Sequence, residues 1–376
     1  MMSQNNLFPL ILFVLFSLSA AVQLFYYLWF YLAVHLKKEK PGKPADKPVS
    51  VIICARNEAE NLKNFLPSVL EQDYPDYEVI VVNDCSEDNS YDILGSFINK
   101  YPHLRVSNVN KDPKFTHNKK FAQFIGIKAA KNDILVFTDA DCMPESTKWL
   151  EGIASNFEEK TCFVLGYGGY LNKKGILNKY IRYDCLTIAM QYLGMAIRGV
   201  PYMGVGRNLA YRRSLFFENK GFGTHNHVIS GDDDLFVNSN SDKYNTAVEF
   251  SHESHTRSVP CSTFSDWSIQ KKRHLTTAPY YKFRDKLLLI AEPASRIIFY
   301  AAFIVLLFLP FLWQYALMIF GVRLITQITV MVLVQKKLNE PGMAGYSLFF
   351  DIFSPLINGF LFLSNAFKRP GKYQWK

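Results

Sequence analysis

Two carboxylates separated by one residue, in Asp139-Ala140-Asp141, are the strongest chemical feature of this 376-residue sequence. They follow an apolar run at residues 134–138, which has the pattern of a buried strand. Hard divalent cations take oxygen ligands, and a cation placed between carboxylates and phosphates neutralises a diphosphate. The tripeptide alone is common in solvated turns, so its position after a strand carries the interpretation. We predict that Asp141 binds a metal ion, and that Asp139 binds the same ion, a nucleoside or a water molecule.

Polar side chains follow two other predicted strands. A strand over residues 49–54 is followed by Arg56 and Glu58, and a strand over residues 78–82 is followed by Asp84. The carboxyl ends of parallel strands meet at one edge of an open α/β sheet, and ligands bind there, so we expect these side chains to bind substrate. No glycine-rich loop follows the first strand, which argues against an ordinary dinucleotide-binding site.

The elements that must position these groups alternate between strands and helices. Apolar residues recur at helical spacing over 62–70 after Asn57, which we expect to be the N-cap of that helix. Another helix is expected to begin near residues 86–90, a third strand lies near 104–109, and a third helix spans 119–130. This alternation predicts a parallel, doubly wound α/β sheet.

The N-terminal segment is long enough to cross a membrane. Residues 7–34 are almost entirely apolar, and residues 1–6 carry no Lys or Arg, unlike the start of a signal peptide. Aromatic residues then precede a lysine- and proline-rich linker at 37–48. This order indicates an uncleaved anchor with its C-terminal side in the cytoplasm.

Three further apolar segments lie near the C-terminus. Residues 294–313 and 315–334 predict a hairpin of two crossing helices, and Asp351 interrupts a third run at 345–366. We expect this last run to be re-entrant or interfacial, because a third crossing would leave the basic C-terminus outside the cytoplasm. Arg323 lies within the second span, and we expect it to pair with Asp351 or to hold a lipid phosphate.

The formal net charge of +9 raises the question of nucleic-acid binding. Much of the basic excess flanks the apolar spans, as is typical of the cytoplasmic side of a membrane protein, so we expect no nucleic-acid partner. The six cysteines form no C-x-x-C pair and predict neither a disulfide framework nor a zinc site.

Several motifs together resemble those of family 2 glycosyltransferases with the GT-A fold. The matching segments are 51–58 (VIICARNE), 78–84 (EVIVVND), 119–122 (KKFA), 138–144 (TDADCMP), 206–211 (GRNLAY), 231–235 (GDDDL) and 270–274 (QKKRH). The resemblance covers about residues 49–275, and the motifs keep the family's order and spacing. It implies an inverting enzyme that uses a nucleotide-diphosphate sugar with Mg²⁺ or Mn²⁺.

Position by position, the resemblance implies roles for the residues that bind the donor. Glu58 and Asp84 would contact the nucleoside. Lys119 matches the family's lysine near the base and the diphosphate, whereas the neighbouring Lys120 is interpreted as a solvated helix charge.

The acidic motifs are assigned in the same way. Asp139 and Asp141 match the family's Asp-x-Asp metal motif. The family's general base comes from a Glu-Asp pair, which Asp232-Asp233 matches best, so Asp233 is the expected base and Asp234 the competing register. The chemistry supports this role independently, because a carboxylate that removes the proton of a sugar hydroxyl lowers the barrier to its attack. Three consecutive aspartates also raise each other's pKa values, which suits a base.

The segment from Gln270 to His274 resembles the Gln-x-x-Arg-Trp motif of membrane-bound members. Arg273 would contact the diphosphate, which suits a guanidinium that binds phosphate oxygens bidentately, and Gln270 would lie beside the substrate. His274 stands where the family has Trp, which weakens the case for a stacking platform under a growing glycan. The segment also has the charge pattern of an amphipathic helix on anionic lipid.

The sequence therefore predicts five consecutive parts. They are a transmembrane anchor (1–36), a linker (37–48), a GT-A domain (49–275), an interfacial amphipathic segment (276–293) and a C-terminal membrane region (294–376).

The expected function is transfer of a sugar from a nucleotide-diphosphate donor to a hydroxyl of a lipid or glycan acceptor, with inversion. A hexosyl- or N-acetylhexosaminyltransferase of polysaccharide or glycolipid biosynthesis is expected, integral to the membrane (the inner membrane of a cell), with its GT-A domain in the cytoplasm. Two alternatives stay open, namely a polyprenyl-phosphate glycosyltransferase and a catalytically inactive membrane scaffold. The Gln-x-x-Arg motif argues against the first, and the retained acidic positions argue against the second.

Overall fold

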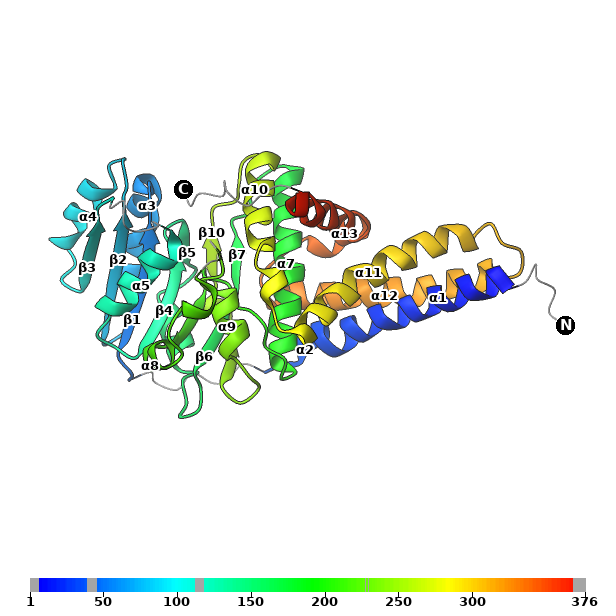
Figure 1. Cartoon of the computed structure of the whole chain (residues 1–376), viewed down its shortest axis with the longest axis horizontal. Coiled ribbons are helices and arrows are strands. Elements are labelled where there is room, and N and C mark those ends of the chain that lie inside the picture. Colours follow the sequence, from blue (N-terminus) through cyan, green and yellow to red (C-terminus); the bar gives the residue numbers. More distant parts are fainter. Residues whose placement is uncertain (1–6, 39–45, 112–117, 227, 229, 368–376) are drawn as a thin grey trace.

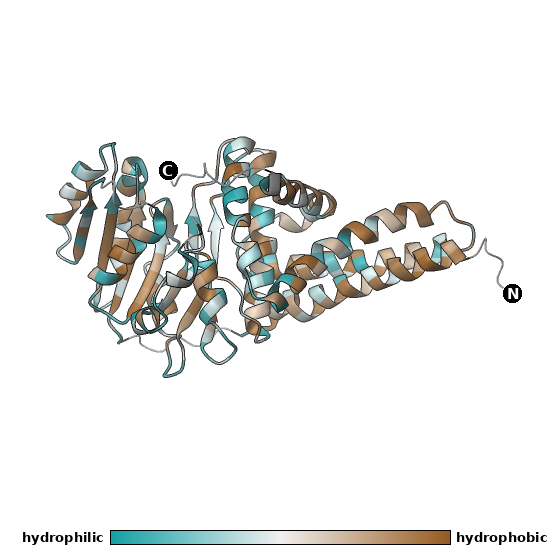
Figure 2. Ribbon diagram, in the orientation of Figure 1, coloured by the Kyte–Doolittle hydropathy of each residue, from teal (hydrophilic) through white to brown (hydrophobic). Residues whose placement is uncertain are grey.

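The computed structural model describes residues 7–38, 46–111, 118–226, 228 and 230–367. A sheet-containing domain lies at one end of the molecule, and long helices extend from it toward the other end (Figure 1). The extending helices are hydrophobic along most of their length, whereas the sheet domain mixes hydrophobic strands with hydrophilic loops (Figure 2).

The strands form two sheets. They are β1 (Val49–Ala55), β2 (Tyr77–Asp84), β3 (Leu104–Val109), β4 (Ile134–Asp139), β5 (Cys142–Pro144), β6 (Phe163–Gly166), β7 (Gly168–Tyr170), β8 (Leu209–Arg212), β9 (Thr246–Glu249) and β10 (Thr256–Ser258). The larger sheet has the order β3-β2-β1-β4-β8-β6-β9, and the smaller one has the order β5-β10-β7.

The helices cover the sheet and form the extension. They are α1 (Leu7–Phe25), α2 (Leu32–Leu36), α3 (Ala59–Leu70), α4 (Ser90–Ile98), α5 (Lys119–Ala129), α6 (Trp149–Ala154), α7 (Ile176–Ile197), α8 (Arg213–Glu218), α9 (Asp234–Asn240), α10 (Phe264–Leu275), α11 (Phe283–Leu306), α12 (Trp313–Lys337) and α13 (Met343–Phe367). A π-helical segment, η2 (Tyr26–Tyr31), joins α1 to α2, and short 3₁₀ turns lie at η3 (Gly223–His225), η4 (His252–Ser254) and η5 (Ala278–Tyr280).

The first four strands confirm the predicted parallel arrangement, and the later strand β8 makes the sheet mixed. Strands β1 to β4 pair in parallel, whereas β8 runs antiparallel to both β4 and β6. The reason lies just before β8, where the carbonyl oxygen of Arg207 accepts a hydrogen bond from Thr138 Oγ1 near the carboxyl end of β4 (3.1 Å). Strand β8 therefore starts at that edge and must run back along β4.

Side chains of β1 alternate between the two faces of the larger sheet. Val49, Val51 and Ile53 pack into a core with α3 and α6. Ile52 and Cys54 face a second core, which includes residues of α5, α7, α12 and α13. Both faces are covered, so every residue of β1 is buried, as its nearly continuous apolar sequence predicts. The sheet domain and the adjoining ends of the long helices therefore share one core.

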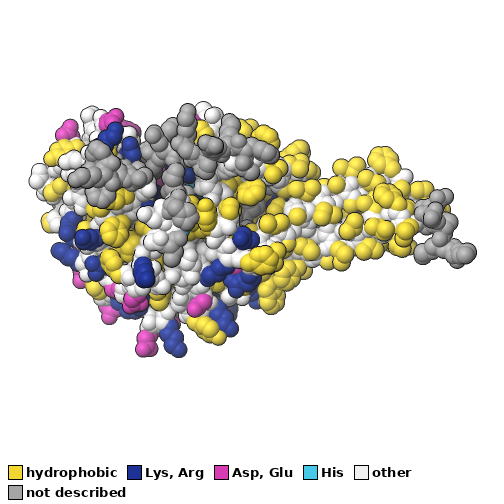
Figure 3. All heavy atoms as spheres, viewed as in Figure 1, with side chains coloured by type: hydrophobic (Ala, Val, Ile, Leu, Met, Phe, Trp, Pro, Cys, Tyr) yellow, Lys and Arg dark blue, Asp and Glu magenta, His cyan; other side chains and the backbone are white. Residues whose placement is uncertain are grey.

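Four helical segments are long and apolar enough to cross a membrane. They are Leu7–Leu36, Phe283–Leu306, Trp313–Lys337 and Met343–Asn365. Figure 3 shows hydrophobic side chains over most of the visible surface of the extension, whereas Lys, Arg, Asp and Glu side chains gather on the sheet domain. One N-terminal and three C-terminal apolar helices thus accompany the sheet domain.

The boundaries of the C-terminal helices differ from the expected ones. Residues 307–312 join helices α11 and α12. The hydropathy pattern instead predicts a connection at residue 314. Residues 283–293, expected in a separate interfacial segment, form the first turns of α11, because Pro293 lies inside the helix without ending it.

Helix α13 does not follow the other long helices away from the sheet domain (Figure 1). Just before it, the Glu340 carboxylate accepts hydrogen bonds from Tyr167 (2.8 Å) and Arg182 (2.8 Å). Near its other end, Asn365 Nδ2 donates to the carbonyl oxygen of Lys272 in α10 (2.7 Å). Both ends of α13 therefore contact the sheet domain, and the helix lies along it.

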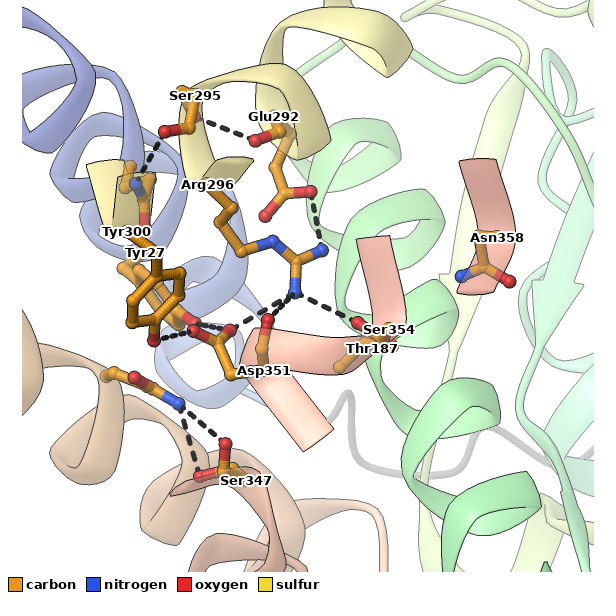
Figure 4. Close-up of polar contacts among 12 residues, drawn as sticks. Tyr27, Thr187, Glu292, Ser295, Arg296, Tyr300, Ser347, Asp351, Ser354 and Asn358 are labelled. Atoms are coloured by element: carbon orange, nitrogen blue, oxygen red, sulfur yellow. Dashed lines mark hydrogen bonds and ion pairs between the residues drawn. The ribbon is translucent and has the colours of Figure 1, made fainter. Parts of the chain in front are cut away.

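Ionic side chains of α11, α12 and α13 form a network, and Figure 4 shows its members from α11 and α13, namely Glu292, Arg296 and Asp351. Arg296 forms ion pairs with Glu292 (2.8 Å) and Asp351 (3.1 Å), and Arg323 pairs with the other oxygen of Asp351 (2.5 Å). Tyr300 also donates to Asp351 (2.6 Å). We call Glu292, Arg296, Arg323 and Asp351 the helix network. The expected pairing of Arg323 with Asp351 is confirmed.

The alternative role of Arg323, binding of a lipid phosphate, is wrong. The side chain is fully buried, and its donors are occupied by Gln23 (2.7 Å), Tyr300 (3.0 Å), Gln327 and Asp351. All three guanidinium nitrogens donate to these side chains, so this arginine holds α1, α11, α12 and α13 together.

Candidate active site

The carboxyl ends of β1, β2 and β4 lie at one edge of the larger sheet. In the parallel register, Cys54 of β1 pairs with Asp139 of β4, and Ala55 of β1 pairs with Asn83 of β2. The loops that follow these strands therefore start side by side, as the topology of open α/β sheets requires. The predicted site residues at the strand ends are thus brought to one edge.

Lys119 lies between carboxylates from two parts of the chain. Its Nζ is 2.7 Å from Asp139 Oδ1 and 3.4 Å from Asp232 Oδ2. Lys119 starts α5, whose N-cap, Asn118, accepts a hydrogen bond from the backbone N–H of Phe121 (2.9 Å). Burial alone would raise the pKa of Asp139, but the charge of Lys119 outweighs burial and lowers it. Asp139 is therefore an ionised carboxylate.

Asp141 is oriented by the smaller sheet. Ser258 Oγ of β10 donates to Asp141 Oδ2 (2.9 Å), and Cys142 Sγ donates to Asp141 Oδ1 (3.3 Å). Burial and repulsion from Asp139 raise the pKa of Asp141. A bound cation would relieve that repulsion, since it attracts both carboxylates.

One group of side chains in the described part of the chain has the geometry of a metal site. Ligand atoms of Asp139, Asp141 and Cys142 lie within 4.8 Å of one another. Burial raises the pKa of the Cys142 thiol well above its usual value, so the thiol stays protonated. The available ligands are then two carboxylates, which fit Mg²⁺ or Mn²⁺ better than a thiolate-seeking metal.

Asn57 is not the N-cap of α3, contrary to the prediction. Glu58 occupies that position, and Asn57 has a φ of 55°, a left-handed conformation that Asn adopts more readily than most residues. The Asn57 Oδ1 atom instead accepts a hydrogen bond from the backbone N–H of Glu87 (2.8 Å). This bond ties the loop after β1 to the loop after β2.

The other predicted nucleoside contacts lie near these two loops. Burial raises the pKa of Glu58 to about 7, although Asn61 Nδ2 donates to its carboxylate (2.6 Å). Asp84 is buried at the end of β2 and accepts a hydrogen bond from Cys85 Sγ (3.4 Å), and Arg56 is half-buried. The structure gathers these side chains, and their contact with a nucleoside stays a prediction.

Asp234, the alternative candidate for the general base, is held by hydrogen bonds within the protein. Its carboxylate accepts hydrogen bonds from Thr277 Oγ1 (2.5 Å), the Tyr281 hydroxyl (2.6 Å) and the backbone N–H of Leu235 (2.7 Å). The side chain is buried, and these bonds tie the start of α9 to the segment between α10 and α11. A carboxylate enclosed in this way is poorly placed to reach a substrate.

Asp233 is the most accessible of the three consecutive aspartates. Its Oδ2 accepts the backbone N–H of Gly206 (2.6 Å), and its Oδ1 accepts that of Asp234 (2.7 Å). Burial, followed by repulsion from Asp232 and Asp234, raises the pKa of Asp233 to about 7. A carboxylate with this pKa holds and releases a proton near neutral pH, as a general base must.

Lys120 is not a solvated helix charge, contrary to the prediction. Its side chain is 2% exposed, and its Nζ donates to the carbonyl oxygens of His225 (2.8 Å) and Val228 (2.8 Å). Burial lowers the pKa of Lys120 to about 8. This lysine therefore positions the backbone that precedes Asp232, Asp233 and Asp234.

Helix α10 carries Arg273, the predicted phosphate contact. Burial would raise the pKa of Asp139, but the charge of Lys119, followed by those of Arg207 and Arg273, lowers it. Contact of Arg273 with a phosphate stays a prediction. Gln270 Oε1 lies 3.6 Å from Cys261 Sγ, and His274 is exposed. An ion pair between Lys271 and Asp184 of α7 (2.6 Å) fixes the helix.

Comparison with known proteins agrees with this geometry. Residues 50–218 match the model of glycosyl transferase family 2. A glycosyltransferase of Haloferax volcanii, AglE, is 31% identical over 187 residues, which make up 49% of this chain and 58% of AglE. The Escherichia coli protein named UDP-Glc:alpha-D-GlcNAc-diphosphoundecaprenol beta-1,3-glucosyltransferase WfaP is 26% identical over 171 residues, or 41% of this chain and 65% of WfaP. The chain thus spans less than two thirds of each relative.

A solved structure shows the same fold over nearly the whole chain. The mannosyltransferase PcManGT from Pyrobaculum calidifontis, in complex with GDP-Man and Mn²⁺, superposes with a TM-score of 0.58 and 20% identity, covering 90% of this chain and 99% of that one. The sheet domain has the GT-A fold, and residues 50–218 within it match the model of glycosyl transferase family 2.

Proposed function

We propose that the protein is a metal-dependent glycosyltransferase that uses a nucleotide-diphosphate sugar. The observation that carries the proposal is the group of Lys119, Asp139, Asp141, Asp232 and Asp233, which we call the active-site cluster. Carboxylates outnumber cations in it, so it suits a divalent cation that in turn binds a diphosphate. The match of residues 50–218 to glycosyl transferase family 2 supports the same reaction class.

The donor's diphosphate is the leaving group of the proposed reaction. Asp139 and Asp141 would hold Mg²⁺ or Mn²⁺, which when bound supplies positive charge to the departing diphosphate. Arg273 adds a guanidinium whose fork matches phosphate oxygens, and Lys119 keeps Asp139 ionised and in place. Arg273 would thus orient the leaving group, whereas Lys119 would orient a metal ligand.

Asp233 is the proposed general base. It takes the proton of the acceptor hydroxyl while that oxygen forms a bond to the anomeric carbon. The bond from this carbon to the diphosphate breaks at the same time, and its electron pair leaves with the diphosphate. Attack from the face opposite the leaving group inverts the anomeric carbon. The backbone N–H groups of Gly206 and Asp234 hold the carboxylate in position.

We further propose that α1, α11 and α12 cross the membrane and that α13 lies at its surface. A helix whose two ends contact one domain cannot reach the far side of the bilayer. The exposed face of α13 carries Phe349, Phe353 and Phe360, whereas Asp351 points into the protein. Lys336 and Lys337 at the domain end of α12 support a cytoplasmic domain, where nucleotide sugars are available.

The acceptor is proposed to be lipid-linked, because the active-site cluster belongs to a domain anchored at the membrane surface. The name of WfaP includes a diphosphoundecaprenol-linked acceptor, which supports this class. A hexosyl or N-acetylhexosaminyl donor in polysaccharide or glycolipid synthesis fits the same setting.

The proposal is tested with the full-length protein in detergent. Nucleotide sugars are supplied one at a time with Mn²⁺ and a membrane lipid extract, and released nucleotide is measured. We expect release with one donor, its abolition by EDTA and its restoration by Mn²⁺. Asp141→Asn should abolish nucleotide release. Lys243→Gln, at an exposed surface position, should release nucleotide at the wild-type rate.

Each alternative gives a different result in this assay. Calorimetry that shows no Mn²⁺-dependent binding of UDP or GDP, together with no release, would support an inactive scaffold. Nearly intact turnover in Asp233→Asn would favour transfer to a polyprenyl phosphate, because an ionised phosphate needs little help from a base.

A further inference from the structure

Arg207 stands on a rigid part of the backbone at the edge of the active-site cluster. Its carbonyl oxygen accepts hydrogen bonds from Thr138 Oγ1 (3.1 Å) and Thr256 Oγ1 (2.9 Å). The next residue, Asn208, donates to the carbonyl oxygens of Tyr167 (2.8 Å) and Ser254 (2.8 Å). The side chain of Arg207 therefore extends from a fixed point between the two sheets.

The guanidinium of Arg207 has weak partners only. Its centre lies 4.3 Å from the centroid of the Tyr170 ring, and its Nη2 is 3.6 Å from Cys185 Sγ, a weak acceptor. Its Nη1 is shielded from solvent and has no hydrogen-bond partner among the residues that the structure describes. Neither of these contacts supplies a negative charge. A cationic donor that is shielded from solvent and has no partner is unfavourable, so the site favours an anion.

The carboxylates of Asp139 and Asp141 have other partners, since Asp139 pairs with Lys119 and Asp141 accepts a hydrogen bond from Ser258. The charge of Arg207 favours the ionised forms of Asp139 and Asp141, but it forms no ion pair with either within the described residues. A divalent cation on these aspartates would occupy them further. Phosphate oxygens are the ligand that fits an arginine fork beside a metal–carboxylate site.

We propose that Arg207 binds a phosphate group of a substrate. This inference rests on the proposed function. The phosphate belongs either to the diphosphate of the donor or to a lipid-linked acceptor. Cys185 and Tyr170 place the guanidinium beside α7, and α7 contacts both α13 and η2, so a phosphate carried by a membrane lipid could reach it. Arg273 would serve the same metal site from α10.

The donor arm of the test uses isothermal titration of the full-length protein in detergent. Wild type, Arg207→Gln and Arg207→Lys are titrated with inorganic diphosphate and with UDP or GDP, each in the presence of Mn²⁺. If Arg207 binds the donor, Arg207→Gln weakens the binding of inorganic diphosphate and of the nucleotide by about 10–100-fold, the range for a hydrogen bond to a charged group. Arg207→Lys keeps the charge but not the fork and should recover part of the loss.

The acceptor arm measures turnover in nanodiscs with a diphosphoundecaprenol-linked sugar. If Arg207 binds the acceptor phosphate, Arg207→Gln raises the KM for this lipid by about 10–100-fold, changes kcat less, and leaves the binding of diphosphate and nucleotide unchanged. An acceptor sugar without phosphate, linked to an alkyl chain, should then show the same KM in both proteins. A change in either arm supports the phosphate site and identifies its source.

Unchanged affinities in both arms, in an Arg207→Gln protein with wild-type thermal stability, would overturn the inference. If Arg207→Gln does not fold, Arg207→Lys carries the same comparison, and Lys243→Gln controls for loss of a surface charge. Arg207-dependent binding of diphosphate in a protein that turns over no nucleotide sugar would keep the inference and remove the proposed function.

Discussion

Two clusters of charged side chains in the described part of the chain, the helix network and the active-site cluster, are built in opposite ways. The helix network contains two arginines and two carboxylates, each carboxylate paired with an arginine. The active-site cluster contains four carboxylates and one lysine. The first is electrically balanced by its own residues, whereas the second needs a cation from outside.

This difference separates a structural cluster from a ligand site. Taking charges out of water is costly unless they are paired, so a balanced network can hold helices together in a membrane. An unbalanced one is stable only if it stays partly protonated or binds a ligand. In the active-site cluster, burial and repulsion between neighbouring carboxylates raise the pKa values of Asp141 and Asp233.

Removal of the proposed base gives the largest expected effect. Asp233→Asn should lower kcat by about 10²–10⁴-fold, because a general base contributes a factor of that size. Binding of UDP or GDP with Mn²⁺ and thermal stability should stay near wild type, since the variant loses a repelled charge. Loss of nucleotide binding as well would show that Asp233 is a structural residue.

Breaking the helix network should act on stability instead. Arg323→Leu leaves Asp351 with one fewer partner in a buried site and should destabilise the protein by roughly 3–5 kcal/mol. The double variant Arg323→Leu/Asp351→Leu should recover much of that loss. Thermal unfolding in detergent measures both. Wild-type stability of Arg323→Leu would contradict a structural role for this pair.

The pH dependence of activity and of stability tests the raised pKa of Asp233 in the active-site cluster. The pKa of Asp233 is raised to about 7, and a base must be deprotonated, so kcat/KM should fall about tenfold per pH unit below pH 7. The contribution of Asp233 to the free energy of unfolding should change with pH in the opposite direction to kcat/KM. The folded metal-free protein binds this proton more tightly than the unfolded chain, so Asp233 lowers stability as pH rises from about 4 to 7.

Thermal unfolding of the metal-free protein from pH 4 to 8 checks that sign. The fall in stability should be smaller in Asp233→Asn, in which the group cannot titrate. An identical pH dependence in the two proteins would contradict a raised pKa for Asp233.

The smallest expected effect concerns the orientation of a metal ligand. Ser258→Ala removes the hydrogen bond to Asp141 Oδ2, which should weaken Mn²⁺ binding by about 2–10-fold, the equivalent of one ordinary hydrogen bond. Calorimetric titration with Mn²⁺ measures the change. Ser262→Ala, at an exposed position nearby, serves as the control and should bind Mn²⁺ like the wild type.

The parts of the site that could be predicted are those that follow strand ends. Asp84 and Asp139 are fixed by their position after an apolar strand, since parallel topology brings such ends together. Lys120 and Arg207 could not be assigned in this way, because their roles depend on burial against segments distant in sequence. Their only signal was their place within motifs whose neighbouring residues had clearer roles.

The fold shows the same limit. The antiparallel strand β8 depends on where the chain returns after α7, and hydrophobic pattern does not encode that direction. Likewise, α13 is as apolar as a crossing helix, and only its bonds to α10 and the preceding Glu340 show that it lies along the sheet domain.

Glu340 has a mechanical consequence. The Glu340 carboxylate, just after α12, forms ion pairs with Arg182 of α7 and Arg257 of β10. These pairs attach the end of α12 to both α7 and the smaller sheet. If α12 crosses the membrane as proposed, these ion pairs would hold the active-site cluster at a fixed height above the lipid, and the protein would select acceptors by their length. Lipid-linked acceptors of one, two and three sugars should show a sharp optimum, which Glu340→Gln should broaden.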